Sequence, residues 1–497
     1  MKRDAESAEL DGSADANGSS KQAKVEEVEA EDISPEQATR RDNRIRSGAE
    51  CPYLDTISRQ TLDFDFEKFC SVSLSPVNVY ACLVCGKYFQ GRGLHTHAFT
   101  HAMERDHHVF MKLEDGTVWC LPDGYRVEDR SLDVIRFVLN PKYSAQQVEA
   151  MDREARWVRA LDGTEYMPGL VGLNNMKAND YVNVAVQIMA RVVPIRNFFL
   201  LPAAHYPNCR SVLVQRFGEL MRKLWNPRNF KGQVSPHEFM RAVMAASNGR
   251  FTINAQADPV DFWIWFVNAL RADLHAVPSG KGKKSILTKC FQGELEVTTQ
   301  AGTGKAAQPN AQGQIADVVE KVPFLMLGLD LPPAPLYRDA LEKNIIPQVP
   351  IFDLLRKFDG QRPVEVPGQG VRRMRITKLP RFLVLQMKRF TRNQFFREKN
   401  PTIVNFPVKN LELADIIPVP PGSASKYDLI ANVVHEGMPD KGSYHAQVHR
   451  QGEDTWYDVQ DLRVTDVLPQ MVALSETYLQ MYELRTDKPS AASRAVK

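Results

Sequence analysis

Cysteine and histidine are concentrated in one short stretch of this 497-residue chain. Five of the eleven histidines lie between positions 95 and 108, shortly after the Cys-x-x-Cys pair of Cys82 and Cys85. Such a pair presents two thiolates to one ion, and His101 with His107 would complete the tetrahedral set that structural zinc prefers. A segment of this size also needs a metal to fold stably. The sequence therefore predicts a small domain organised by zinc.

The choice of histidines leaves alternatives open. His97 and His108 lie in the same stretch and compete with the two ligands chosen, and such histidines can also pack or face solvent without a metal. The spacing differs from that of the common DNA-reading finger, whose histidines follow the second cysteine by about twelve residues. We therefore expect a zinc module of another kind.

The N-terminal region has a composition that cannot build a core. Residues 1–36 contain four Lys or Arg residues, eleven Asp or Glu residues and no aromatic residue. Such a segment buries too little apolar surface to offset the entropy of folding. We expect residues 1–48 to form a disordered acidic tail, whose basic cluster at 40–46 is either a nuclear import signal or an exposed linker.

Composition also narrows the compartment and the partners. No stretch approaches the roughly eighteen apolar residues of a membrane span, and no apolar run follows the first residues as in a secretory signal. Seven cysteines with one Cys-x-x-Cys pair suit a metal and free thiols in a reducing compartment. A net charge of +3 indicates no large nucleic-acid face, so direct RNA contact stays an open question. These features predict an intracellular protein without membrane association.

Changes in composition divide the rest of the chain. We expect a folded cysteine- and histidine-rich segment over 49–130, a helical linker over 131–164, a large mixed domain over 165–486 and a polar tail over 487–497. Within the large domain, residues 300–314 are rich in Gly, Ala, Gln and Thr and offer almost nothing to bury. That segment is predicted to be a mobile excursion.

A loop followed by a helix is predicted over 172–187, where turn-forming residues lead into an apolar-periodic run. This segment resembles the first signature box of the ubiquitin-specific proteases, Gly-Leu-x-Asn-Leu-Gly-Asn-Thr-Cys-Tyr-x-Asn, which places a nucleophilic cysteine at the start of a helix. The position suits the chemistry, because a helix N-terminus and a nearby histidine lower the pKa of a thiol. The matching residues are Gly172, Leu173, Asn175, Tyr181, Asn183 and Gln187.

The nucleophile position of this box holds Asp180. A carboxylate carries the charge of a thiolate and would cap the exposed helix amides. It cannot replace the chemistry of the thiolate, because hydrolytic carboxylates usually act in pairs that activate water. The other cysteines of the domain, Cys209 and Cys290, lie outside the box and are expected to be packed thiols. The resemblance therefore predicts a protease fold without its nucleophile.

A second box tests this interpretation independently. Residues 427–461 indicate antiparallel strands and resemble the histidine box of the family, Gly-His-Tyr-x-Ala-Tyr followed by Trp-Tyr-x-Phe-Asp/Asn-Asp. Ser443 stands at the general-base position, where it cannot shuttle a proton near pH 7, and Gln460 stands where an Asp or Asn would orient the base. His445 shares a strand face with Ser443, which keeps residual hydrolysis as an alternative. The degenerate positions around the expected active site are Asp180, Ser443, Gln460 and Asn175.

Motifs between the two boxes keep the order of the family. Residues 256–262, 379–390 and 405–407 resemble its Gln-Gln-Asp helix, its Leu-Lys-Arg-Phe strand and its Phe-Pro turn. The resemblance implies an α+β fold, with a zinc finger followed by a papain-like domain of helical thumb and mixed or antiparallel palm and fingers. The paired Cys-x-x-Cys motifs of the family's fingers are missing from the sequence, so strand pairing and packing must hold any fingers together.

The cysteine- and histidine-rich segment resembles the ubiquitin-binding zinc finger found beside many deubiquitinases. Three further cysteines lack the paired partners that extra zinc sites in that module need: Cys51, Cys70 and Cys120. The resemblance therefore implies one structural Zn²⁺. The pocket of the module captures the C-terminal Gly-Gly of ubiquitin, and Arg92 and Trp119 match it. Leu121 stands where a tyrosine is expected, and the missing hydroxyl weakens the case for ubiquitin binding.

The run Lys-Ala-Asn-Asp that ends at Asp180, and the run Gly-Ser-Tyr at 442–444, resemble the splicing-factor branch of the family. That branch implies a nuclear, non-catalytic scaffold that binds proteins of the spliceosomal tri-snRNP during spliceosome assembly in pre-mRNA splicing. Two alternatives stay open, a reader of ubiquitin or a ubiquitin-like protein that uses the finger, and a residual deubiquitinase.

Overall fold

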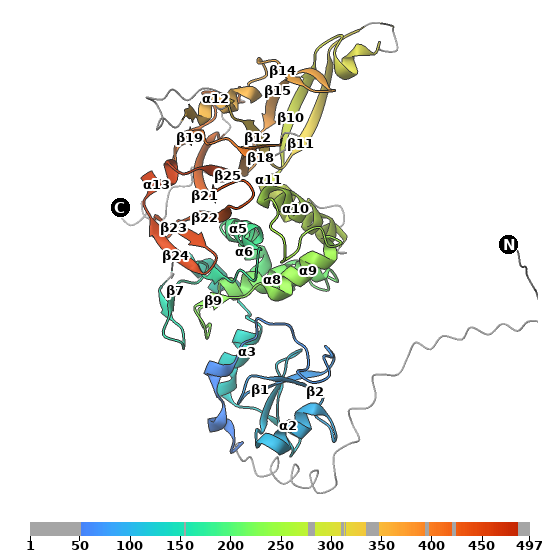
Figure 1. Ribbon diagram of the computed structural model, residues 1–497, viewed down its shortest axis with the longest axis vertical. Helices are drawn as coiled ribbons and strands as arrows, with labels where there is room; N and C mark the ends of the chain where they lie inside the picture. Colours follow the sequence, from blue (N-terminus) through green and yellow to red (C-terminus); the bar gives the residue numbers. More distant parts are fainter. Residues whose placement is uncertain are drawn as a thin grey trace, which may run out of the picture. The chain divides into compact units, whose positions relative to one another are not determined.

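The computed structural model describes residues 51–485 with short gaps (Figure 1). The gaps are 154–155, 277–283, 310–312, 314, 334–346, 393–396 and 420–423. Contacts divide the chain into one unit of Met1–Ile57 with Phe69–Val127 and a larger unit of Ser58–Lys68 with Glu128–Lys497. The expected acidic tail, its basic cluster and the polar C-terminal tail lie outside the described residues, and the expected domain boundaries stay predictions.

The smaller unit is built on one antiparallel sheet, with strand order β2-β1-β3-β4-β5. Its strands are β1 (Val79–Cys82), β2 (Tyr88–Gln90), β3 (Val109–Lys112), β4 (Val118–Cys120) and β5 (Tyr125–Val127). The helix α2 (His97–Arg105) buries Ala98 and Ala102, one turn apart, in a small core with Tyr80 and Phe110. This packing holds the helix that carries His101 beside the Cys-x-x-Cys turn.

The helical layer of the larger unit surrounds α5 (Asp180–Met189), whose ten residues are all buried. Its polar residues Asn183 and Gln187 donate their side-chain N–H groups to the backbone carbonyls of Leu173 and Val171, so these buried donors are bonded. The other long helices are α6 (Val193–Leu200), α8 (Val212–Leu224), α9 (His237–Ala246) and α10 (Pro259–Ala276). The shorter ones are α3 (Asp133–Leu139), α4 (Ala145–Ala150), α7 (Pro202–His205), α11 (Ile286–Phe291), α12 (Ile351–Leu355) and α13 (Pro469–Ala473).

An eight-stranded sheet packs against this helical layer. Its order is β12-β16-β25-β21-β22-β23-β24, with β20 paired to β21, and only β12 and β16 run parallel among its described pairs. The strands are β12 (Leu327–Asp330), β16 (Phe382–Lys388), β20 (Leu411–Glu412), β21 (Lys426–Glu436), β22 (Ser443–Arg450), β23 (Thr455–Gln460), β24 (Arg463–Val467) and β25 (Thr477–Leu484). Helix α5 contacts β21, β22 and β23, so both signature boxes meet in one place.

A separate four-stranded antiparallel sheet extends from the larger unit in Figure 1, with order β11-β10-β15-β14. Its strands are β10 (Gly293–Thr299), β11 (Val318–Phe324), β14 (Val364–Val366) and β15 (Gly370–Lys378). Residues 300–314 were expected to have almost nothing to bury, and residues 310–312 and 314 lie outside the described residues. The described part contains the short helix η5 (Gly304–Ala307), in which Ala306 is fully buried. A Cβ on Gly304 would lie 2.0 Å from the Gln369 carbonyl oxygen, so glycine permits this close approach.

Four two-stranded pairs complete the larger unit. They are β6 (Val158–Arg159) with β7 (Glu165–Tyr166), β8 (Gly172–Leu173) with β9 (Gln233–Val234), β13 (Gln348–Pro350) with β19 (Ile403–Asn405), and β17 (Phe390–Arg392) with β18 (Arg397–Lys399). The β8–β9 pair fixes the loop that leads to Asp180.

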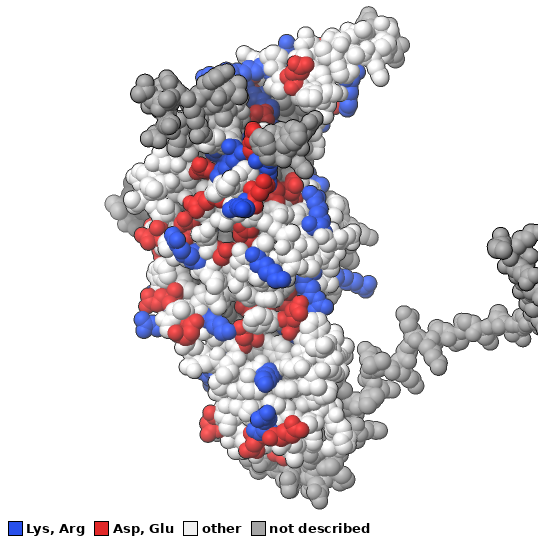
Figure 2. Space-filling view, viewed as in Figure 1, with Lys and Arg blue, Asp and Glu red and all other residues white. Residues whose placement is uncertain are grey.

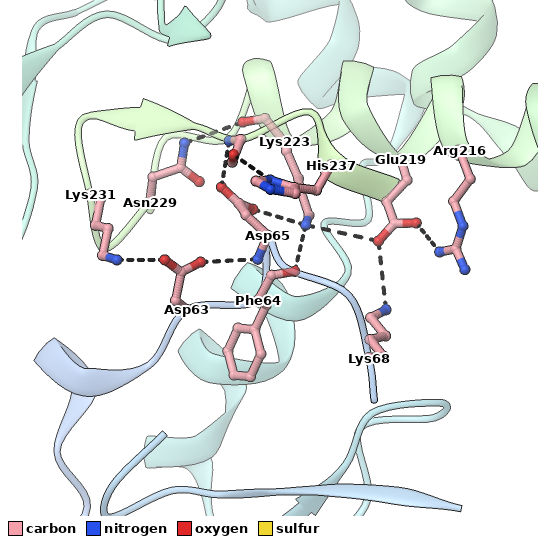
Figure 3. Close-up of polar contacts among 11 residues, drawn as sticks. Asp63, Phe64, Asp65, Lys68, Arg216, Glu219, Lys223, Asn229, Lys231 and His237 are labelled. Carbon is pink, nitrogen blue, oxygen red and sulfur yellow. Dashed lines mark hydrogen bonds and ion pairs between the residues drawn. The ribbon is translucent and has the colours of Figure 1, made fainter. Parts of the chain in front are cut away.

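The segment Ser58–Lys68 lies in sequence between the two stretches of the smaller unit, but it packs on α8 of the larger one (Figure 3). The ammonium group of Lys223 donates to the Phe64 carbonyl and to Asp65, both at 2.9 Å. Burial opposes the charge on Lys223, but Asp65 and Glu219 outweigh it and raise the pKa of the lysine. Asp63 pairs with Lys231 at 2.5 Å. Buried and half-buried ion pairs therefore hold this segment to the helical layer.

Surface charge in the larger unit is mixed. On the face shown in Figure 2, basic and acidic side chains alternate over short distances, in keeping with the net charge of +3. Within the described residues, no helix is both long and apolar enough to cross a membrane. Helices and sheets in both units confirm the expected α+β class.

Candidate functional site

Asp180 lies at the centre of a closed set of hydrogen bonds between helix and sheet. One carboxylate oxygen accepts from the backbone N–H of Tyr181 at 2.9 Å. The other accepts from the backbone N–H of Tyr444 at 3.0 Å and from the Gln256 side-chain amide at 2.6 Å. Gln256 also donates to the carbonyl of Gly442 at 3.1 Å. The carboxylate thus joins the start of α5 to the start of β22 and to the loop before α10.

The expected role of Asp180 as the helix cap needs correction. The N-cap position belongs to Asn179, and Asp180 is the first helical residue. The Asn179 side chain accepts from Met176 N–H at 2.7 Å, which shapes the preceding loop. Asp180 contacts one helix amide only, because its second oxygen is directed to the neighbouring strand.

Burial raises the pKa of Asp180, since its side chain is almost fully enclosed. The hydrogen bonds from Tyr444, Gln256 and Tyr181 oppose this rise, and the negative charge of Asp461 adds to it. The group is therefore a hydrogen-bond acceptor in a crowded site rather than an exposed, freely ionised base.

Asn175 and Asn183 meet at Asp461. The two carboxylate oxygens of Asp461 accept from Asn175 at 3.0 Å and from Asn183 at 2.9 Å. Asp461 has a φ of 50°, in the left-handed region that aspartate tolerates better than most residues. The sequence motifs did not reveal these roles of Asp461 and Gln256, although two asparagines in one box signal a need for a polar partner.

Ser443 and Gln460 lie on the adjacent strands β22 and β23. The Gln460 amide donates to the Ser443 hydroxyl at 3.3 Å. Among the described residues, no hydrogen bond joins Ser443 to Asp180. The structure thus brings the three expected triad positions into one region, but only Ser443 and Gln460 are linked directly by a hydrogen bond.

His445 lies two residues after Ser443 in β22, and two carboxylates contact its ring. Its Nδ1 lies 2.6 Å from Asp458 and its Nε2 lies 3.6 Å from Glu436, and the side chain is buried. The thiols of the unit are elsewhere, Cys290 in α11 and Cys209 before α8, and burial raises both pKa values, that of Cys290 to about 12. A histidine–aspartate pair is therefore present without a thiolate nucleophile beside it.

The structure brings Cys82, Cys85, His101 and His107 together in the smaller unit. Their four ligand atoms lie within 4.8 Å of one another. Each cysteine sulfur lies 3.5 Å from a histidine nitrogen, and the two nitrogens are 3.0 Å apart. Zinc bonds of about 2.3 Å to sulfur and 2.0 Å to nitrogen place neighbouring tetrahedral ligands about 3.5 Å apart. The donor set and its spacing fit a structural zinc ion.

The competing histidines have other surroundings. His108 has its Nδ1 2.7 Å from the Leu121 carbonyl and its Nε2 2.7 Å from Asp106, and its ring stacks on Tyr53. His97 is the first residue of α2 and is outside the group of four. These contacts favour the two histidines chosen from the sequence.

Arg92 and Trp119 are in direct contact. The Arg92 guanidinium lies 3.9 Å from the centre of the Trp119 ring, a cation–π arrangement. Leu121 is fully buried in the core of the unit. The two residues matched to a ubiquitin-tail pocket therefore lie together, while the leucine at the expected tyrosine position offers no exposed polar group.

The remaining cysteines of the smaller unit are buried. Cys51 and Cys120 share a hydrogen-bond cluster with the Tyr125 hydroxyl, and the neighbouring Cys51 together with burial raises the pKa of Cys120. Cys70 accepts from the backbone N–H groups of Val72 and Ser73. Both arrangements place the thiols inside the fold. The Cys51–Cys120 contact could not be predicted from the sequence, because the two residues are far apart in the chain.

Two family models match the chain. The model described as "Ubiquitin carboxyl-terminal hydrolase" matches residues 171–482, which is more than half of the chain. The chain belongs to this family. The model "Zn-finger in ubiquitin-hydrolases and other protein" matches residues 70–132. The expected fold, a zinc-finger module followed by a ubiquitin-specific-protease domain, is therefore confirmed.

Relatives place the chain within the family. It is 48% identical to human "Ubiquitin carboxyl-terminal hydrolase 39" over 479 residues, 92% of this chain and 84% of that protein. It is 40% identical to the "Probable mRNA-splicing protein ubp10" of Schizosaccharomyces pombe, over 87% of this chain and 88% of that protein. A structure described as "Crystal structure of an essential yeast splicing factor" superimposes with a TM-score of 0.72 at 29% identity, covering 88% of this chain and 100% of that one. The expected splicing-factor branch is confirmed.

Proposed function

We propose that this protein acts in pre-mRNA splicing as a scaffold that has a protease fold and no isopeptidase activity. The observation that carries this proposal is the environment of Asp180, which occupies the nucleophile position and accepts hydrogen bonds from Tyr444, Gln256 and Tyr181. A carboxylate used in this way provides no thiolate, and Ser443 provides no general base. The fold then serves through its surface.

The relatives support the splicing part of the proposal. The fission-yeast relative is named as a probable mRNA-splicing protein, and the superimposed yeast protein is described as an essential splicing factor. We infer that this protein works in the nucleus, binds proteins of the spliceosomal tri-snRNP, and acts in spliceosome assembly. Direct RNA contact is not part of the proposal, because the exposed charges in Figure 2 are mixed.

The absence of catalysis can be tested with ubiquitin that carries a fluorogenic leaving group. The purified parent chain should release no fluorophore above background. Asp180→Cys should also be inactive, because neither Ser443 nor Gln460 can act as the general base for the new thiol. If the parent cleaves the substrate and Asp180→Ala does not, the proposal of a scaffold without isopeptidase activity is wrong. If Asp180→Ala still cleaves it, the activity comes from a different site in the chain.

The splicing assignment can be tested by purification of the tagged protein from nuclear extract. Tri-snRNP proteins should accompany the parent chain and should also accompany Asp180→Cys, since the scaffold does not use the cleft chemically. Recovery without any tri-snRNP component would remove the splicing role and leave the fold assignment intact.

We further propose that one structural Zn²⁺ is held by Cys82, Cys85, His101 and His107. The tetrahedral spacing of these side chains supports this ligand set. The domain boundaries proposed with it are 49–130 for the finger, 131–164 for the linker and 165–486 for the protease-like domain.

A second candidate function is a reader of ubiquitin or of a ubiquitin-like protein. The stacking of Arg92 on Trp119 favours it, because it orders two residues suited to a C-terminal tail. Buried Leu121 counts against it, since no hydroxyl replaces the expected tyrosine. Titration of the full chain with free ubiquitin decides the question: binding lost in Trp119→Ala would support the reader, and no binding at millimolar ubiquitin would exclude it.

Residual hydrolysis is a third candidate, favoured only by the contact between His445 and Asp458. The fluorogenic assay tests it with His445→Gln. Activity that depends on His445 would establish the reaction, and inactivity of the parent would remove it.

A further inference from the structure

A pocket outside the degenerate active site lies between the end of α5, the start of α6 and the turn from β22 to β23. It is open to solvent, and the space at its mouth and between its walls together is about 410 Å³, part of which is bulk solvent. The charged and aromatic residues that line it include Arg191, Arg196, Arg450, Asp152 and Trp225. Neither Asp180 nor Ser443 contributes to its walls.

Three guanidinium groups are buried around this pocket. The exposed fractions of Arg191, Arg196 and Arg450 are 8%, 2% and 6%. Burial, and then the positive charges of Arg450 and Arg196, lower the pKa of Arg191 to about 9. Buried charges normally need compensation by opposite charges, because the interior solvates them poorly.

The described carboxylates compensate this charge only in part. Asp152 forms two hydrogen bonds with Arg196, and its single charge also acts on Arg191 and Arg450. Glu453 also acts on Arg450, but it is exposed and accepts from the Tyr457 hydroxyl at 3.0 Å. Positive charge therefore exceeds negative charge among the described groups of the pocket.

Several buried N–H donors on the residues that line the pocket also have no acceptor among the described residues. Arg191 and Arg450 each use one terminal nitrogen on a backbone carbonyl, of Gly169 and Pro168 respectively. The Nε atoms of both arginines and the indole nitrogen of Trp225 are buried without a partner in the described structure. Trp225 lies beneath two of the guanidiniums, 4.5 Å from Arg196 and 5.2 Å from Arg191. The residues that line the pocket thus carry three guanidinium groups and a single carboxylate, that of Asp152.

We propose that this pocket binds a phosphate group. A phosphate dianion presents three strong acceptor oxygens, carries two negative charges, and matches the forked geometry of arginine. A single carboxylate would neutralise less of the charge and offer fewer oxygens. Free inorganic phosphate and the phosphorylated side chain of another protein share this chemistry.

Calorimetric titration of the full chain with inorganic phosphate, at constant ionic strength, tests the site. The parent should bind phosphate saturably, and Arg450→Gln should weaken binding about tenfold or more, because a charged hydrogen-bonding partner is lost. Asp152→Asn should strengthen binding, because it frees Arg196. Arg356→Gln, at an exposed ion pair elsewhere in the unit, should leave the affinity unchanged.

A purely structural role for the arginines predicts another pattern. In that case phosphate would not bind saturably, or all three variants would bind it as the parent does, and either result overturns the proposal. If Arg450→Gln fails to fold by circular dichroism, Asp152→Asn decides alone, and an unchanged affinity rejects the site. Parallel titration with O-phosphoserine separates the sources: binding as tight as that of phosphate indicates a phosphorylated side chain, and no binding indicates free phosphate.

Discussion

At the scale of single residues, buried polar groups of this chain are held by partners distant in sequence. Asp180 accepts from Tyr444, which lies 264 positions away. An unpaired buried N–H costs about 1–3 kcal/mol, so the carboxylate at position 180 is useful to the fold whether or not it has any chemistry. Aspartate in place of the family's cysteine at position 180 can therefore stabilise the fold even though it supplies no nucleophile.

The buried side chain of His435 predicts how the free energy of unfolding depends on pH. Burial, and then the charges of Lys399 and Arg397, lower the pKa of His435 to about 4, and its Nδ1 has no partner in the described structure. The unfolded chain takes up this proton near pH 6.5, whereas the folded chain does so only near pH 4. The free energy of unfolding should therefore fall as pH drops from about 6.5 to about 4, by at most about 3 kcal/mol from this residue.

Urea denaturation at pH 7.5 and at pH 5 measures the effect. His435→Gln should lose part of the stability difference between the two pH values, while the exposed His275→Gln should keep it. Equal pH dependence in parent and His435→Gln would contradict the assignment.

At the scale of elements, two short segments depend on contacts that their own sequences do not supply. The segment Ser58–Lys68 is held to α8 by ion pairs, and the Cys82 and Cys85 side chains lie beside His101 of α2 and His107 of the segment before β3. Such elements have little stability alone, because neither forms a core of its own.

The first element-scale prediction concerns Lys223. Lys223→Met should destabilise the protein by about 3 kcal/mol or more, because it leaves Asp65 and Glu219 without their buried partner. Lys409→Met breaks an exposed pair of similar length, 2.7 Å against 2.9 Å, and should cost less than about 1 kcal/mol. Chemical denaturation of both variants compares the two losses, and equal losses would mean that burial does not decide the contribution.

The second concerns the metal. Cys85→Ser should abolish stoichiometric zinc binding and unfold the smaller unit, because three ligands cannot close a structural site. Cys70→Ser should retain zinc, since Cys70 lies outside the ligand group. Elemental analysis with circular dichroism reads both effects. Retention of zinc by Cys85→Ser would show that His97, His108 or another group is the ligand.

At the scale of the whole molecule, neither unit is one continuous stretch of the chain. Contact grouping assigns Ser58–Lys68 to the larger unit, although Phe69–Val127 of the smaller unit follows it. A fragment that starts at residue 128 therefore lacks the partners of Lys223. It should unfold at a lower temperature than the same unit in the full chain.

Addition of a peptide of residues 58–68 should restore part of that stability. A peptide with Asp65→Asn should restore less, because the lysine would face a neutral group. Thermal unfolding of the fragment with each peptide checks this, and no shift with the parent peptide would contradict a structural role for the segment.

The sequence by itself was enough to predict the family, a tetrahedral set of candidate zinc ligands, and the replacement of the nucleophile and the base. These conclusions depend on atom types at particular positions, which a local motif reveals. The partners of Asp180 and Lys223, the buried Cys51–Cys120 contact and the arginine pocket were decided only by the tertiary structure. Their members lie on elements far apart in the chain, and local patterns carry no information on which distant side chains meet.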